Sequence, residues 1–123
     1  MRTSSSVRLL ALGLRIGSRE LVDRALGRAV TATVDSGGQY PLPASVRGRD
    51  AVAALLVGAM AECDVTIDER TVNHQPGVVF RRDQRVIAVM VTRSSFARVR
   101  EIWVVANPQK LASWNTGCEP TAT

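Results

Sequence analysis

The segment from residue 98 to residue 114 joins a strand pattern to a helix cap, and this combination constrains the fold more than any other part of the chain. The strand pattern is an alternation of two faces, with Val99, Glu101, Trp103 and Val105 on one face and Arg98, Arg100, Ile102 and Val104 on the other. Asn107 is a favourable N-cap, and Pro108 suits the first position of a helix. We therefore expect a strand over 98–106 and a short helix over Pro108–Trp114.

The rest of the chain has the pattern of helices followed by a meander of strands. The expected helices are 7–16, 19–27 and 50–62, and the expected strands are 29–34, 65–72, 78–80 and 85–93. Turns or bends are expected at 35–38, 73–77, 81–84 and 94–97, with an irregular segment at 39–47. The strand over 85–93 is nearly continuously apolar, which is typical of a central strand covered on both faces.

This order of elements predicts an α+β fold. A curved antiparallel sheet would pack on three helices, and a short C-terminal helix would follow the last strand. We expect the sheet to close on the helices as a cone, whose mouth is a natural place for a pocket.

The 123 residues suit one domain, which we place at 7–114, between a disordered N-terminus (1–6) and a flexible tail (115–123). No segment reaches the roughly 20 apolar residues of a membrane helix, and residues 9–14 are too short and too poorly flanked for a signal peptide.

Cys63 and Cys118 do not have zinc-site spacing. Two free thiols are the simpler interpretation, although a disulfide stays open, and we expect a cytoplasmic protein.

The chain carries a formal net charge of +5, and 15 of its 16 basic residues are arginines. This excess suits a solvated surface, an acidic protein partner or nucleic acid. The arginines are spread along strands without an aromatic stacking platform, and no helix-turn-helix is present. We therefore rank direct nucleic-acid binding last and expect no sequence-specific DNA recognition and no membrane partner.

No catalytic, phosphate-binding or metal-binding motif is present, so no metal or cofactor is expected. The weak acid–base candidates are Asp35, His74 and Glu101, with Asp68 as a further titratable residue. Glu101 could point into the cone and act as a general base. The favoured alternative places it on the outside, paired with an arginine of a neighbouring strand.

Four short segments resemble motifs of one known domain. They are DSGG at 35–38, RGRD followed by AVAALL at 47–56, NHQPG at 73–77 and NPQKL at 107–111. In this order they resemble the DGGG turn, the start of the middle helix, the NGQPG motif and the NPDKL end of the SnoaL-like domain found at the C-terminus of certain extracytoplasmic-function sigma factors. The resemblance covers about residues 9–114. Ser36, His74 and Gln109 differ from the family motifs.

The resemblance implies a cone of the nuclear-transport-factor-2-like class and a non-catalytic regulatory role. In such sigma factors the domain folds back on the promoter-binding domains and tunes their engagement with RNA polymerase, so the implied partners are sigma factor domains or RNA polymerase. The candidate partner-binding residues are Asp35, Gly37, Gly38, Asn73, Gln75, Pro76, Gly77, Asn107, Pro108, Lys110 and Leu111. The segments that read promoters in that family are absent here, as in a stand-alone relative, a split gene product or a fragment.

Three alternatives remain open at this stage. The same fold class also contains small polyketide-cyclase-like or isomerase-like enzymes, and the cone could hold a small apolar ligand without chemistry. A homodimer could form through Ile102 and Val104 on the outer face of the sheet. Gln109 replaces an acidic residue of the family motif, which would leave Lys110 unopposed and favour a more acidic partner surface.

Overall fold

The computed structural model of the chain describes residues 5–38, 44–61, 64–72 and 74–115. The helices are α1 (Ser5–Ile16), α2 (Arg19–Ala25), α3 (Arg49–Ala61) and α4 (Pro108–Leu111), which continues into the 3-10 helix η1 (Ala112–Asn115). The strands are β1 (Leu26–Asp35), β2 (Ser45–Arg47), β3 (Thr66–Val72), β4 (Gln75–Arg82), β5 (Arg85–Ser95) and β6 (Arg98–Val105).

The boundary between α1 and α2 follows the sequence signals. Gly17 takes a φ of 71°, which suits the residue after a helix, and the Ser18 hydroxyl accepts a hydrogen bond from the backbone N–H of Leu21. The helix α1 begins at Ser5, two residues earlier than the apolar pattern predicts. The Ser6 side chain is buried, and its hydroxyl lies 2.9 Å from that of Ser94 on β5, which fixes this first turn to the sheet.

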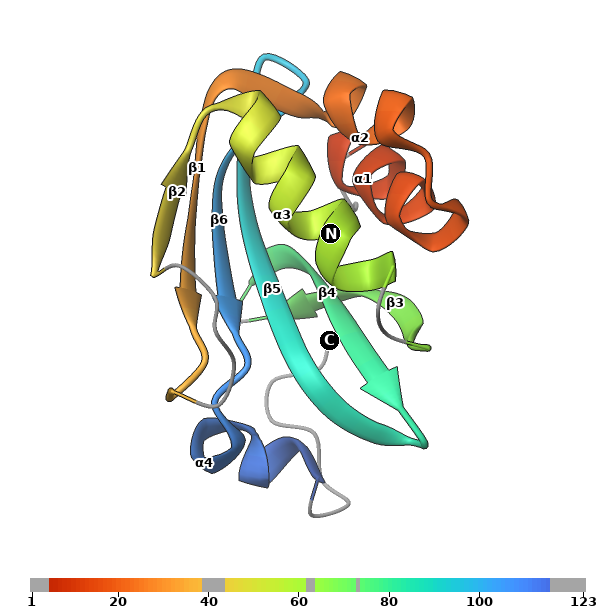
Figure 1. Ribbon diagram of the computed structural model, residues 1–123, viewed down its shortest axis with the longest axis vertical. Helices are drawn as coiled ribbons and strands as arrows, with labels where there is room; N and C mark the ends of the chain where they lie inside the picture. Colours follow the sequence, from red (N-terminus) through yellow and green to blue (C-terminus); the bar gives the residue numbers. More distant parts are fainter. Residues whose placement is uncertain (1–4, 39–43, 62–63, 73, 116–123) are drawn as a thin grey trace.

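The six strands form one curved sheet in the order β2-β1-β6-β5-β4-β3 (Figure 1). The meander from β3 to β6 is antiparallel, as the sequence predicts. However, β1 and β6 run parallel, so the sheet is mixed, and the expectation of an antiparallel sheet is wrong for this pair. The short strand β2 pairs with β1 in a segment that was expected to be irregular. The α+β class and the cone-like curvature are confirmed.

A β-bulge interrupts the alternation predicted for β6. Arg93 of β5 is opposite Glu101, but Ser94 is opposite Val99, so Arg100 is an extra residue on β6. As a result Val99 and Ile102, which a strict alternation places on opposite faces, both lie in the core beneath the helices. The two-face assignment from the sequence is therefore wrong between residues 99 and 102.

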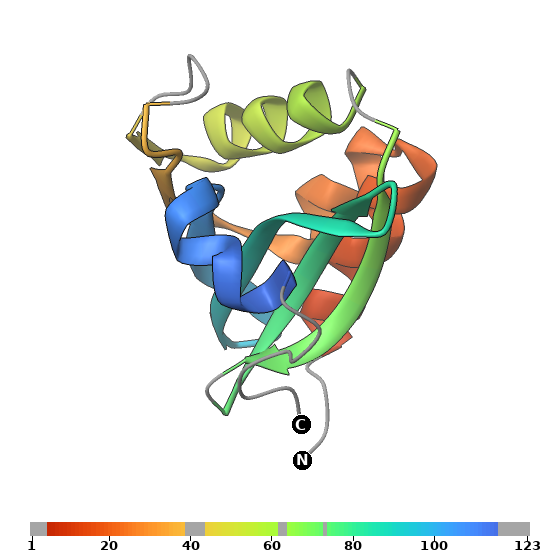
Figure 2. The ribbon, with the colours of Figure 1, turned by 90° about the horizontal axis from the view of Figure 1, so that it is seen from below.

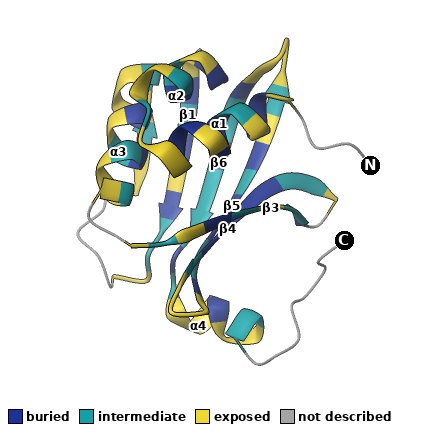
Figure 3. Ribbon diagram, turned by 90° about the vertical axis from the view of Figure 1, so that its right-hand side faces the viewer, coloured by how far each residue is buried: buried dark blue, intermediate teal, exposed yellow. Residues whose placement is uncertain are grey.

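The helices α1, α2 and α3 cover one face of the sheet, here called the inner face (Figures 1 and 3). Residues of α1, α2 and α3 pack there with residues of the strands, in one apolar cluster whose fully buried members include Leu10, Val22, Val52, Met90 and Val99. Burial of this apolar surface is the main driving force for folding. The cluster fills the space between the helices and the sheet.

The opposite, outer face carries a second and smaller apolar cluster at one end of the sheet. Its buried members are Val72, Val79, Val86, Val89 and Leu111, and Trp114 packs against them. Leu111 thus attaches α4 to the outer face, across the end of the sheet (Figure 2). Because β5 contributes to both clusters, it is covered on both faces, as its continuous apolar run predicts.

Residues 75–77 belong to β4 and not to a bend, which corrects the boundary expected from the sequence. Among the described residues the turn here is His74, which takes a φ of 67°. No helix within the described part of the chain is both long and apolar enough to cross a membrane.

Gly77 allows β4 and β5 to approach closely, and we predict that Gly77→Ala destabilises the fold. A Cβ atom at this position would lie 2.6 Å from the Met90 carbonyl oxygen, which is backbone of the paired strand and cannot move without distorting the sheet. We expect a loss of about 1–3 kcal/mol in the free energy of unfolding, measured by urea denaturation.

Gly58→Ala is the matched control, because nothing lies within 4 Å of a Cβ atom there and Gly58 is exposed in the middle of α3. This change should stabilise the protein by about 0.5–1 kcal/mol. Equal unfolding midpoints for wild type and Gly77→Ala would contradict the packing described for β4 and β5.

Candidate functional site

The turn that follows β1 is built by one carboxylate and two glycines. Asp35 Oδ1 accepts a hydrogen bond from the backbone N–H of Gly37 at 3.1 Å, which is the local pattern of an Asx turn. Gly37 and Gly38 take φ values of 62° and 80°, in the left-handed region that favours glycine. Both glycines are exposed, and neither carries a side chain of its own over the backbone of this turn.

The helix that follows β6 begins as predicted. Asn107 Oδ1 accepts a hydrogen bond from the backbone N–H of Gln109 at 3.1 Å, and Pro108 occupies the first turn. The helix is shorter than expected, because α4 ends at Leu111 and the chain continues as a 3-10 turn to Asn115. The Asn115 side chain exchanges hydrogen bonds with the backbone of Val86, which fixes this last turn against β5.

The parallel pairing of β1 and β6 brings these two segments together. Asp35 is opposite Val105, and the N–H of Ala106 donates to the Asp35 carbonyl oxygen at 2.7 Å. The side-chain amide of Asn107 lies 3.5 Å from Asp35 Oδ1, and Lys110 Nζ lies 2.5 Å from Asp35 Oδ2. We call Asp35, Gly37, Asn107 and Lys110 the motif cluster.

Close packing within the motif cluster explains why residue 37 is a glycine. A Cβ atom at residue 37 would lie 2.7 Å from Cγ of Asn107, so a larger residue would displace the side chain that caps α4. At Gly38, by contrast, a Cβ atom would have no neighbour within 4 Å, and glycine is favoured there only by the positive φ. The turn and the cap are therefore one structural unit.

Lys110 forms an ion pair with Asp35 and lowers the pKa of its carboxyl group. The hydrogen bond from Lys110 is the largest cause that lowers the pKa of Asp35 below its usual value, against the opposing effect of partial desolvation, and the Gly37 N–H adds to the lowering. Asp35 is therefore ionised at neutral pH and is held in an ion pair. Lys110 is opposed by Asp35, so the expectation that Gln109 leaves this lysine unopposed is wrong.

The candidate partner-binding residues of the two segments differ in exposure. Gly37, Gly38, Pro108 and Lys110 are exposed at or beside the motif cluster, where a partner could reach them. Leu111 is only 2% exposed and holds α4 against the sheet, which corrects its expected role as a contact residue.

The remaining candidates belong to the NHQPG segment and lie away from the motif cluster. Gln75 and Pro76 are partly buried at the start of β4, where the Pro76 carbonyl accepts a hydrogen bond from the Thr92 hydroxyl at 3.0 Å. Gly77 is buried, and the close approach to β5 accounts for it. Asn73 lies outside the described residues.

The acid–base candidates are not gathered in a cavity. Glu101 lies 3.7 Å from Nη1 of Arg93 on the neighbouring strand, which confirms the outward, paired alternative. His74 is exposed, and Asp68 pairs with Arg81. The buried polar side chains in the described ranges are those of Ser6 and Thr92, and no three potential metal ligands among His, Cys, Asp and Glu come together there.

The apolar patch expected for a dimer does not lie on the outer face. Ile102 is 1% exposed within the inner core, and Val104 packs against the same core. The β-bulge at Arg100 is the physical reason, because it changes the side of the sheet to which the following residues point. The prediction for Ile102 and Val104 as a dimer patch is therefore wrong.

The sequence interpretation missed a group of aromatic and basic residues on the outer face. The Arg93 guanidinium lies 5.6 Å from the centre of the Trp103 ring, and both side chains line a shallow hollow of about 330 Å³ with Gln75. Phe96, in the β5–β6 turn, is 90% exposed. A phenylalanine in the turn between two strands was the only sequence signal for this group.

Solved structures share this fold. SigJ, an extracytoplasmic-function sigma factor of Mycobacterium tuberculosis, matches at 22% identity with a TM-score of 0.68, and the match covers 95% of this chain and 45% of the sigma factor. The chain thus spans less than half the length of that protein. A SnoaL-like protein of unknown function from Burkholderia thailandensis matches over 80% of this chain and 88% of its own at 13% identity, with a TM-score of 0.61.

An NTF2-like protein of unknown function from Mesorhizobium loti matches over 87% of this chain and 95% of its own, at 13% identity and a TM-score of 0.60. No family model matches the chain, and no curated protein matches it in sequence. At these identities the similarity establishes the fold, which is the SnoaL-like, NTF2-like cone.

We predict that Lys110→Met raises the pKa of Asp35, because the variant removes the main cause that lowers it. A carboxylate whose pKa is lower in the folded state adds stability above its unfolded pKa of about 3.9, and this contribution disappears as the pH falls through the folded pKa. The difference in unfolding free energy between wild type and Lys110→Met should therefore shrink as the pH falls below about 3.9 and through the lower pKa of the folded state.

The measurement is an NMR titration of the Asp35 side-chain carboxyl carbon, together with urea denaturation across the same pH range. Arg82→Met is the matched control, because Arg82 is exposed on the β4–β5 hairpin. An Asp35 pKa that is the same in wild type and Lys110→Met would show that the lysine does not control this carboxylate.

Proposed function

We propose that this chain is a non-catalytic interaction domain that binds a sigma factor or RNA polymerase and modulates the initiation of transcription. The observation that carries the proposal is the motif cluster. Two segments about 70 residues apart, DSGG and NPQKL, resemble motifs of the sigma-factor SnoaL-like domain and are joined by direct contacts between Asp35, Asn107 and Lys110. The fold similarity to the sigma factor SigJ supports the same proposal.

The interior of the cone favours an interaction domain over an enzyme of the cyclase or isomerase type. Such an enzyme needs an inward acid or base beside its substrate. The inner cluster consists of apolar side chains, and every Asp, Glu and His side chain in the described residues is exposed or partly buried. The described residues therefore place no Asp, Glu or His side chain inside the cone to act as the acid or base of a cyclase or isomerase.

Recognition at the motif cluster would rest on backbone groups and shape more than on net charge. Asp35 and Lys110 neutralise each other, and Gly38, which has no neighbour within 4 Å of a Cβ position, leaves the backbone of the turn open at that residue. Exposed Pro108 extends the same surface along the first turn of α4. A partner that docks here would form hydrogen bonds to the turn and pack against the proline.

We predict that purified chain associates with an extracytoplasmic-function sigma factor or with RNA polymerase, and that it changes the yield of run-off transcription from a promoter of that sigma factor. Association is measured by co-precipitation and by sedimentation of the mixed components. If neither protein associates with the chain and transcription is unchanged at saturating concentration, the proposed function is wrong.

A pair of bulky substitutions locates the contact. Gln109→Trp places a large side chain on the exposed surface of α4 beside the motif cluster, and Ala54→Trp places the same side chain on the exposed surface of α3. We expect roughly tenfold weaker association for Gln109→Trp, equivalent to about 1.4 kcal/mol, and no change for Ala54→Trp. Equal affinity for the two variants would remove the motif cluster from the contact.

A further inference from the structure

The strands β1 and β6 begin at the end of the sheet opposite to the motif cluster (Figure 1). Three arginines contact backbone carbonyl groups near these strand starts. The carbonyl oxygen of Leu26 lies 3.1 Å from Nε of Arg49 and 3.4 Å from Nη1 of Arg98, and Arg100 Nε donates to the Ser95 carbonyl at 3.3 Å. None of these three arginines has a carboxylate of the described residues within salt-bridge distance. The remaining guanidinium donors are open to an anion.

The β5–β6 turn holds an aromatic ring out beside these arginines. Phe96 and Ala97 take φ values of 52° and 61°, the left-handed conformation in which two-residue hairpin turns favour Asn and Gly. A phenylalanine adopts this conformation rarely, and here its ring is 90% exposed with the Arg100 guanidinium 5.9 Å from the ring centre. Burial does not explain this residue, so the strain points to a function outside the fold.

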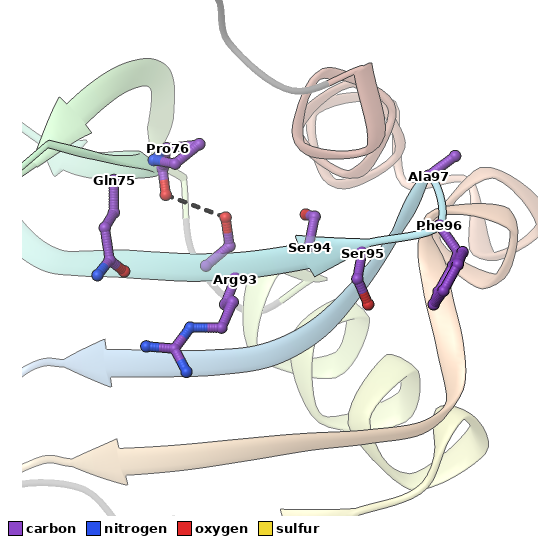
Figure 4. Close-up of a pocket in the computed structure, with 8 residues that line it drawn as sticks. Gln75, Pro76, Arg93, Ser94, Ser95, Phe96 and Ala97 are labelled. Carbon is purple, nitrogen blue, oxygen red and sulfur yellow. Dashed lines mark hydrogen bonds between the residues drawn. The ribbon is translucent and has the colours of Figure 1, made fainter.

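A second aromatic and arginine pair lies further along the outer face. This pair consists of Trp103 and Arg93. The Arg93 side chain is 63% exposed and also forms an ion pair with Glu101. One residue of each pair, Phe96 and Arg93, lines a shallow hollow of about 540 Å³ together with Gln75, whereas Arg100 and Trp103 are not part of its lining. Arg93, Ser95 and Phe96 extend to the same side of the hairpin, whereas Ser94 points to the other side (Figure 4).

We propose that this strip, formed by Gln75, Arg93, Phe96, Arg98, Arg100 and Trp103, binds single-stranded nucleic acid without sequence specificity. The phosphates would contact Arg98, Arg100 and Arg93, and two bases would stack on the rings of Phe96 and Trp103. A sheet face that carries solvent-accessible aromatic rings between basic residues is a known platform for unpaired bases, and here Phe96 is exposed and Trp103 is partly buried.

The aromatic rings favour nucleic acid over an acidic protein segment as the occupant. An acidic segment would use the arginines but would gain little from two rings held apart by basic residues, whereas every base has a face that stacks. The sequence alone indicated no stacking platform near the arginines. The platform arises from the fold, because the hairpin and the β-bulge bring the rings and the arginines to one face.

The test is fluorescence anisotropy with a labelled single-stranded oligonucleotide of about 12 mixed nucleotides, at salt concentrations from about 50 to 200 mM. Three phosphate contacts predict a slope of about −2 for log affinity against log salt. Arg98→Ala and Arg100→Ala should each reduce the slope by about 0.7, and Phe96→Ala should weaken binding at least about fivefold with an unchanged slope.

The matched controls remove the same chemistry elsewhere. Arg85→Ala removes an exposed arginine from the β4–β5 hairpin, and Ile16→Ala removes an exposed apolar side chain, 62% exposed, from the end of α1. Both should bind the oligonucleotide as wild type does. Circular dichroism confirms that each variant is folded before its affinity is interpreted.

Three outcomes overturn the proposal. They are no binding at the lowest salt, a Phe96→Ala variant that binds as tightly as wild type, or a duplex of the same sequence that binds as tightly as the single strand. Displacement of the oligonucleotide by poly-glutamate at equal charge, together with an unchanged Phe96→Ala variant, would assign the strip to an acidic protein. The Gln109→Trp variant should bind the oligonucleotide normally, so this proposal and the proposed function can fail separately.

Discussion

The parallel pairing of β1 with β6 is the constraint on which both candidate surfaces depend. Neighbouring parallel strands run in the same direction, so their C-terminal ends lie side by side. The turn after β1 therefore meets the helix cap after β6, with Asp35 opposite Val105. The N-terminal ends of the same two strands also lie side by side. There Leu26 is opposite Val99, and its carbonyl oxygen accepts hydrogen bonds from two arginines. One strand pair thus places the motif cluster at one end and the basic, aromatic strip towards the other.

The β-bulge at Arg100 determines which side chains each face receives. It turns Val99 and Ile102 into the inner core and leaves Glu101 and Trp103 outside. The inner face is consequently apolar and covered by the three helices, and both proposed surfaces lie on the outer face and at the ends of the sheet. This division is consistent with a domain that acts through contacts with other macromolecules.

Local signals in the sequence were sufficient for most elements, and they failed where a distant residue decides the outcome. The Ser18 and Asn107 caps and the continuous apolar run of β5 are local, and the structure has them where the sequence predicts. The parallel pair, the bulge at Arg100 and the ion pair of Asp35 with Lys110 depend on residues far apart in the chain, which periodicity does not report. Phe96 was missed because a turn residue carries no periodic signal.

Hydrogen–deuterium exchange of the chain, alone and with a sigma factor or RNA polymerase, tests the central claim most directly, because it reports where a partner covers the backbone. We expect slower exchange at the amides of residues 36–38 and 109–111 in the mixture, and unchanged exchange in α1, α2 and α3. A complex that leaves these two segments unprotected, or a mixture with no protection anywhere, would contradict the assignment of the motif cluster as the partner-binding surface.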